Sequence, residues 1–204
     1  MDYSELQRDL DQGMRLTEVG EKHFKLYLQH SKAIQQYRLM KMQPRDFKTM
    51  VVFCYGPRNT GKTYWVKQMD PNYFRKPIGH WMDGYDGQET VLYDDFTGTG
   101  FGSIKDHLAA FDKYKYTAKV HFGFCQWRPR QIFITCNVKP EELFPKLQED
   151  APELVRAFWS RVEYIIEFKE RQSATSPPII EYKDDYDAWH IMDMEWHSGF
   201  KRGH

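Results

Sequence analysis

The stretch MVVFCYGPRNTGKT, residues 50–63, decides the fold, because an apolar segment runs directly into a loop with a glycine near each end. The loop fits the pattern G-x-x-x-x-G-K-[ST], in which backbone N–H groups surround a phosphate. Gly61 lets the backbone approach that phosphate, Lys62 adds a positive charge, and Thr63 offers a hydroxyl to Mg²⁺. The sequence therefore predicts a nucleotide site formed by Gly56, Pro57, Arg58, Asn59, Thr60, Gly61, Lys62 and Thr63.

Two carboxylates follow the next apolar segment. Residues 90–94 predict a strand whose end carries Asp94 and Asp95. In nucleotide hydrolases an acid at a strand end steadies the Mg²⁺ shell, and a second acid can orient or deprotonate the attacking water. We assign Asp94 to the metal, together with Thr63, and Asp95 to the water. A solvated pair of strand-end acids is the alternative interpretation.

A third apolar segment, residues 131–136, ends at Asn137. An amide at this point can hydrogen-bond the γ-phosphate and the lytic water at once, through its carbonyl and its NH₂ group. An asparagine after a strand is otherwise a common turn residue. The order of the three segments favours a sensor role, which makes Lys62, Asp95 and Asn137 the catalytic group within the chain.

Strand-like and helix-like segments alternate after residue 49, which predicts an α/β fold. The expected architecture is the P-loop NTPase (AAA+-like) parallel sheet flanked by helices. Strands are predicted at 50–55, 90–94, 117–122, 131–136 and 162–168, and helices at 61–69, 103–112 and 152–160.

We divide the chain into three parts. Residues 1–46 predict a small helical subdomain, for which internal packing and oligomerisation both fit the pattern. Residues 47–170 form the expected ATPase domain. Residues 171–204 are rich in acids and aromatics without sustained periodicity, which predicts a flexible tail, and binding of a partner stays open.

Composition excludes some classes of protein. The formal net charge is zero, with 29 basic and 29 acidic residues, so any contact with nucleic acid must come from local placement of charge. Cys54, Cys125 and Cys136 form no CxxC pair, so we expect reduced, buried thiols. The sequence has no signal peptide pattern and no apolar run of membrane-spanning length, so we expect a soluble, intracellular protein without a membrane partner.

The segment WMDGYDGQE, residues 81–89, runs into VLYDDF, residues 91–96. With the glycine-rich loop before it and Asn137 after it, this order resembles the superfamily 3 helicases. It is most similar to the replication-associated (Rep) proteins of circovirus-like single-stranded DNA viruses, over about residues 15–168. The resemblance implies an ATP-dependent DNA helicase motor with ATP and Mg²⁺ as cofactors. It also implies a homo-oligomeric ring, expected to be a hexamer, that acts on single-stranded DNA in the host nucleus with 3′ to 5′ polarity.

Rep proteins of this type usually carry an N-terminal nicking endonuclease with a His-hydrophobic-His metal pair. The sequence has no such pair, because His190 and His197 are too far apart and follow the motor. We therefore expect the helicase part alone, without nicking activity.

The family has a β-hairpin that projects into the pore of the ring, and residues 116–124 match it with departures. His121 stands where relatives commonly have lysine, and residues 122–123 stand where they often have two glycines. Lys119 and His121 share a face of an extended strand, so both are predicted to contact the DNA backbone. An ordinary half-buried hairpin is the alternative.

In a ring of this family a neighbouring subunit contributes an arginine to the nucleotide site. The resemblance points to Arg161 first and Arg156 second. Relatives often show two adjacent arginines where this chain has Ser160 and Arg161. A surface arginine at a helix end is the alternative.

Two other functions remain open at this point. A small-molecule or nucleotide kinase shares the loop, and Arg128 and Arg130 could imitate its arginine-rich lid. A non-hydrolysing, nucleotide-dependent assembly or packaging module is the other, although the intact pair Asp94 and Asp95 argues against it.

Overall fold

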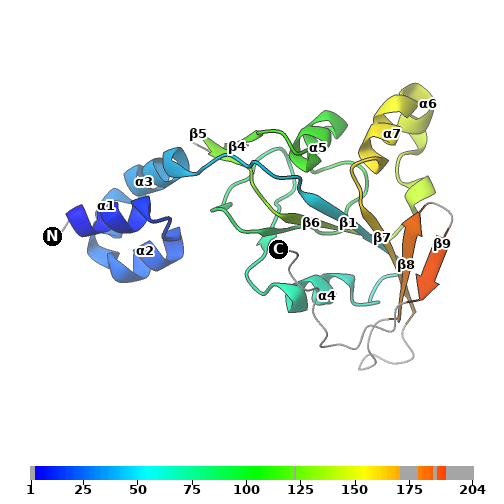
Figure 1. The fold of residues 1–204 in the computed structure, drawn as a ribbon, viewed down its shortest axis with the longest axis horizontal. Coiled ribbons are helices and arrows are strands. Elements are labelled where there is room, and N and C mark those ends of the chain that lie inside the picture. The colour runs from blue at the N-terminus through cyan, green and yellow to red at the C-terminus, as the bar shows by residue number, and fades with distance from the viewer. Residues whose placement is uncertain (1–2, 122, 171–178, 186–187, 192–204) are drawn as a thin grey trace.

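The computed structural model describes residues 3–121, 123–170, 179–185 and 188–191. Within these residues the centre of the fold is a seven-stranded sheet with the order β2-β3-β6-β1-β7-β8-β9 (Figure 1). The first five strands in this order are parallel, and β8 and β9 are antiparallel additions at one edge. The strands are β1 (Met50–Tyr55), β2 (Phe74–Arg75), β3 (Thr90–Tyr93), β6 (Gln131–Cys136), β7 (Tyr164–Lys169), β8 (Ile179–Asp185) and β9 (Ala188–Ile191).

Helices cover both faces of this sheet, which confirms the predicted α/β fold. Helix α4 (Lys62–Met69) packs on one face, while α5 (Ile104–Phe111) and α7 (Pro152–Trp159) pack on the other (Figure 1). Alternate residues of β1 enter the two cores, with Phe53 on the α5 side and Val52 on the α4 side. Burial on both faces explains why the central strands read as continuous apolar runs.

The N-terminal residues form three helices around a small core of their own. These helices are α1 (Tyr3–Asp11), α2 (Leu16–Lys22) and α3 (Phe24–Lys41). Asp86 ties them to the α/β domain, because its Oδ2 accepts a hydrogen bond from the Leu16 N–H at 2.7 Å and its Oδ1 lies 3.2 Å from Arg38 Nε. Their role in oligomerisation stays a prediction. The small core consists of Leu6, Leu10, Val19, Leu26 and Ile34.

Residues 117–120 are extended, as expected, but they lie outside the central sheet. They form β4 (Thr117–Val120), which pairs antiparallel with β5 (Gly123–Gln126) in a separate hairpin. Ala118 and Val120 point into the core of the α5 face, while Lys119 is exposed. The short helix α6 (Pro145–Asp150) and the 3₁₀ helix η1 (Pro140–Glu142) precede α7 and were not predicted.

The flexible tail predicted from residue 171 differs from the structure where the structure describes it. Strand β8 pairs with β7, and β9 pairs with β8. An exposed β7 edge would leave a row of backbone N–H and C=O groups without partners, and β8 satisfies them. Ile180 adds a buried side chain to the core on the α4 face. Residues 171–178, 186–187 and 192–204 lie outside the described residues.

The core on the α5 face contains a histidine, His107, that is 1% exposed. Its ring lies among those of Phe96, Phe111 and Tyr93, with centroids 5.2–5.8 Å away. Burial lowers the pKa of His107 to about 4. The imidazole is therefore neutral in the folded protein at neutral pH.

Acid should destabilise the protein through His107. The unfolded chain binds a proton near pH 6.5 and the folded chain only near pH 4, so stability is lost as pH falls through this window. Between pH 7 and pH 4.5 we expect His107 to account for a loss of about 2 kcal/mol in the free energy of unfolding. Urea denaturation at both pH values should show a smaller loss for His107→Phe. The exposed-site control His30→Phe should behave like the parent protein; an equal loss in all three would contradict the assignment.

Candidate nucleotide site

The phosphate loop follows β1 and depends on three unusual backbone conformations. Gly56 has φ 141°, and a Cβ at this position would overlap the carbonyl oxygen of Phe168 in β7. Gly61 has φ 93° and stands at the start of α4. Asn59 has φ 62°, a region that asparagine tolerates better than most residues. The two glycines thus permit a tight turn between a buried strand and a helix N-terminus, where backbone N–H groups attract anions.

Lys62 is held by the loop itself. Its Nζ donates to the carbonyl oxygens of Gly56 at 2.8 Å and Pro57 at 2.7 Å. The Thr60 hydroxyl donates to the same Pro57 oxygen at 2.9 Å. Burial lowers the pKa of Lys62, and Asp95 opposes that shift. A desolvated ammonium at the loop is placed to bind an anion more strongly than a solvated one would.

Asp94 is the best-connected carboxylate of the site. Its Oδ1 accepts hydrogen bonds from the hydroxyls of Thr63 at 2.6 Å and Thr135 at 2.8 Å. Its Oδ2 lies 2.6 Å from a guanidinium nitrogen of Arg75. The contact between Thr63 and Asp94 joins the two residues that the sequence assigns to the metal.

Asp95 and Asn137 form a second pair. The Asn137 Nδ2 donates to Asp95 Oδ1 at 2.6 Å. Asp95 has φ 58°, a strained conformation for a residue with a side chain, and its N–H is fixed by the Thr135 hydroxyl at 3.0 Å. The amide that sequence reasoning places beside the water-orienting acid is thus in direct contact with it.

These residues surround one cavity of about 590 Å³, large enough for a nucleotide. Gly56, Pro57 and Thr60 shape the loop without lining the cavity. Among the described residues no group of three metal-ligating side chains exists. A Mg²⁺ ion would fit here with Asp94 and Thr63 as protein ligands and phosphate and water for the rest, as this ion prefers. The lining comprises Arg58, Asn59, Gly61, Lys62, Thr63, Tyr64, Asp94, Asp95, Thr135 and Asn137.

Two residues of the site escaped sequence reasoning. Thr135 contacts both Asp94 and the Asp95 backbone, and its place one residue before the end of an apolar strand was the signal that could have found it. Arg75 lies at the end of β2, a two-residue strand that leaves no periodic pattern. Its contact with Asp94 places a cation beside the carboxylate that the sequence assigns to the metal.

The two arginines proposed to act in trans lie away from this cavity. Arg161 lies in the connection between α7 and β7, at the amino ends of the parallel strands. The phosphate loop lies at the carboxyl ends of these strands. Its guanidinium pairs with Asp112 at 2.7 Å and donates to the Ala157 carbonyl at 2.8 Å. Arg156 is exposed, and its side chain makes no hydrogen bond or ion pair with the described residues.

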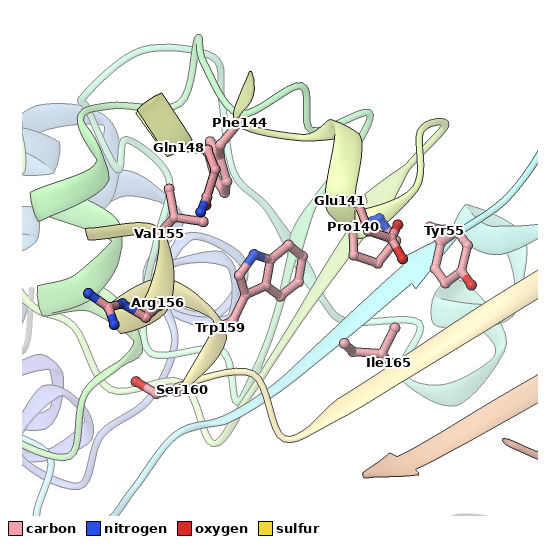
Figure 2. Close-up of a pocket in the computed structure, with 10 residues that line it drawn as sticks. All are labelled: Tyr55, Pro140, Glu141, Phe144, Gln148, Val155, Arg156, Trp159, Ser160 and Ile165. Atoms are coloured by element: carbon pink, nitrogen blue, oxygen red, sulfur yellow. The ribbon is translucent and has the colours of Figure 1, made fainter. Parts of the chain in front are cut away.

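Arg156 borders a second, mostly apolar cavity of about 670 Å³. Figure 2 shows the Trp159 indole at the centre of this cavity and the Arg156 side chain pointing away from Tyr55. Phe144 and Val155 line the same space. Lys119 and His121 lie on the β4–β5 hairpin, also outside the nucleotide cavity.

The sequence that builds this site is similar to that of known proteins. A protein-family model described as RNA helicase matches residues 52–138, from β1 through Asn137. The replication-associated protein of Beak and feather disease virus is 30% identical over 155 residues, covering 74% of this chain and 53% of that protein. Its counterpart in Porcine circovirus 2 is 32% identical over 165 residues, covering 78% and 51%. The counterpart in Pigeon circovirus is 33% identical over 141 residues, covering 69% and 44%.

Over the aligned residues the chain is a relative of the circovirus replication-associated proteins. The matched family model describes the segment from β1 through Asn137 as helicase-type. The chain spans about half the length of the curated relatives it matches. In the described residues, no helix combines the length and the apolar character needed to cross a membrane.

The glycine requirement at the phosphate loop is testable. Gly56→Ala should lower stability and abolish nucleotide binding, because the added methyl group meets the Phe168 backbone, which cannot move without shifting β7. Gly13→Ala is a matched control, since Gly13 also has a positive φ of 86° but nothing lies within 4 Å of its added Cβ. Thermal unfolding and binding of a fluorescent ADP should separate the two variants. Equal losses of stability in the two variants would mean that the positive φ angle alone, and not the close approach of the Phe168 backbone, requires glycine at position 56.

Proposed function

We propose that the chain is the ATP-dependent motor of a viral replication initiator, a superfamily 3 DNA helicase domain that works as a ring on single-stranded DNA. The observation that carries this proposal is the joining of Thr63 to Asp94 and of Asp95 to Asn137 around one cavity. The first pair suits metal-bound phosphates, and the second suits a water molecule beside them.

In this mechanism each residue positions the phosphates, the attacking water or the metal ion. Loop N–H groups and Lys62 hold the β- and γ-phosphates. Asp95 accepts a proton from, or orients, the attacking water, while Asn137 fixes the Asp95 carboxylate and contacts the γ-phosphate. Mg²⁺, when bound beside Asp94 and Thr63, supplies neutralisation of phosphate charge. Little covalent chemistry falls to the protein, so positioning accounts for catalysis.

The structure favours this function over a kinase. A kinase lid must close over the phosphates, which bind at the carboxyl ends of the strands. Arg130 instead directly precedes β6 and so lies at the amino ends of the strands. Its guanidinium lies over the Phe47 ring, 4.6 Å from the centroid, and near Glu89 at 3.4 Å. Arg128 precedes β6 in the same connection.

A ring would bring a neighbour's arginine to each site. Neither Arg156 nor Arg161 lines the cavity at the chain's own phosphate loop, so either could serve a neighbour's site. Arg161 would have to leave Asp112, whereas Arg156 is exposed and has no side-chain partner among the described residues. We keep both as candidates for the trans arginine and place Arg156 first on this ground.

Hydrolysis of ATP by the purified chain, with and without single-stranded DNA, is the decisive measurement. We expect turnover that DNA stimulates, and a loss of at least about a hundredfold in Lys62→Ala, because a preorganised charge at the phosphates is removed. Stimulation by a nucleoside or sugar but not by DNA would indicate a kinase. Turnover that DNA leaves unchanged would indicate an assembly or packaging module.

Mixing variants tests the trans arginine. In a 1:1 mixture of Lys62→Ala with an arginine variant, about a quarter of the boundaries in a random ring pair an intact loop with an intact arginine. Hydrolysis should therefore return in part when Arg156→Ala is the partner. The same mixture with Arg161→Ala identifies the alternative residue. Absence of rescue with both arginine variants, at every mixing ratio, would contradict a trans arginine at either position.

A further inference from the structure

Arg75 reaches the candidate nucleotide site from β2, the strand at one end of the described sheet. Strand β2 pairs parallel with β3, and Arg75 lies opposite Leu92 in this register. Asp94 follows Leu92 by two residues, just beyond the carboxyl end of β3, and a guanidinium nitrogen of Arg75 lies 2.6 Å from its Oδ2. The Arg75 side chain is 65% exposed, whereas that of Asp94 is only 12% exposed. One solvent-facing cation therefore pairs with one mostly buried carboxylate.

The two oxygens of Asp94 have different partners. Its Oδ1 accepts hydrogen bonds from the hydroxyls of Thr63 and Thr135, which are both neutral groups. Its Oδ2 contacts the Arg75 guanidinium, the one positively charged group within 4 Å of Asp94 among the described residues. The Lys62 ammonium instead donates to two carbonyls of the phosphate loop. Arg75 is thus the group of this chain that directly balances the negative charge of Asp94.

Two carboxylates line the cavity in which the phosphates of a nucleotide would lie. Asp94 and Asp95 both belong to this lining, and a nucleotide would bring further negative charges beside Lys62 in the same space. Like charges at such short range repel one another, and they do so more strongly where solvent is partly excluded. Arg75 is not among the residues that line the cavity. Its effect on a nucleotide must therefore be exerted through Asp94, which makes Arg75 a positioning residue.

We infer that Arg75 is a counter-ion for Asp94 that allows the site to bind the phosphates of a free nucleotide without Mg²⁺. Mg²⁺, when bound beside Asp94, supplies positive charge at the same carboxylate, so Arg75 contributes most where the metal is missing. The guanidinium can move away at little cost, because most of the side chain is already in solvent. This inference rests on the proposed function for its ligand and adds a residue that sets how strongly nucleotide binding depends on the metal.

Nucleotide binding with and without the metal measures this role. The affinity of the full chain for a fluorescent ADP is determined in excess Mg²⁺ and again in excess EDTA. Arg75→Ala should weaken binding in EDTA about 3- to 10-fold, because the unbalanced Asp94 then repels the phosphates. Binding in Mg²⁺ should change by less than about twofold, since a bound divalent ion is then the largest local charge. The readout is the ratio of the two affinities, which a partial loss of folded protein would leave unchanged.

Two further substitutions at position 75 separate charge from packing. Arg75→Lys keeps the positive charge and should keep the affinity ratio of the parent chain. Arg75→Gln keeps side-chain N–H donors without the charge and should behave like Arg75→Ala. Thermal unfolding of all three variants should match that of the parent chain, because the side chain is largely exposed. A parental ratio in Arg75→Gln would mean that a hydrogen bond suffices, which would overturn the counter-ion role.

Lys67→Ala is the matched control for net charge. Lys67 is exposed on α4 and lies outside the cavity lining, so its removal should leave both affinities unchanged. Equal weakening in Mg²⁺ and EDTA by Arg75→Ala, or no weakening in either, would overturn the counter-ion role. The proposed motor would stand in that case, because the parent chain would still bind the nucleotide. Binding by the parent chain in Mg²⁺ but not in EDTA would also overturn only the counter-ion role. Failure of the parent chain to bind ADP under both conditions would overturn the proposed function and this inference with it.

Discussion

Parallel pairing of β6 between β1 and β3 is the constraint on which the candidate site depends. The register aligns Tyr55 with Cys136 and Tyr93 with Ile134, so all three strands end at one edge of the sheet. The phosphate loop, the two carboxylates and the amide each follow one of these strand ends. A register shift of one residue in β6 would turn Thr135 away from Asp94 and misplace Asn137. The buried apolar residues of these strands therefore position the polar groups that line the candidate nucleotide cavity.

Hydrogen bonds hold the polar groups of the site in place without a nucleotide, and two of these groups are in energetically unfavourable states. Lys62 is desolvated, and Asp95 adopts a left-handed conformation that disfavours a side chain. Contacts inside the site offset these costs. The Gly56 and Pro57 carbonyls bind the ammonium, and Thr135 binds both acidic segments. The Lys62 ammonium would exchange its carbonyl contacts for a phosphate when a nucleotide binds, while Thr135 keeps the two acidic segments in place.

Sequence reasoning found the parts of this structure that rest on local pattern. The bounds of β1 and β6 follow from apolar runs, and the loop follows from glycine and lysine spacing. Contacts between residues that are far apart in the sequence could not be predicted from local patterns. Arg75 meets Asp94 from a two-residue strand, and Arg161 meets Asp112 across 49 residues of chain. Strand β8 is defined by the free edge of β7 more than by its own composition, so an acidic segment after Ser-Pro-Pro was read as a flexible tail.

The loop of residues 81–89 connects parts of the molecule that sequence analysis treated separately. Asp83 binds His121 at the hairpin, and three residues later Asp86 binds Leu16 and Arg38 in the helical subdomain. Arg38 and Asp86 are each 9% exposed, so solvent screens their ion pair little. The same loop runs into β3, which ends at Asp94. Any displacement of the hairpin relative to the helices must therefore move this loop or break one of its two aspartate contacts. A displacement of the hairpin would therefore reach the helical subdomain and β3 through one continuous segment of backbone.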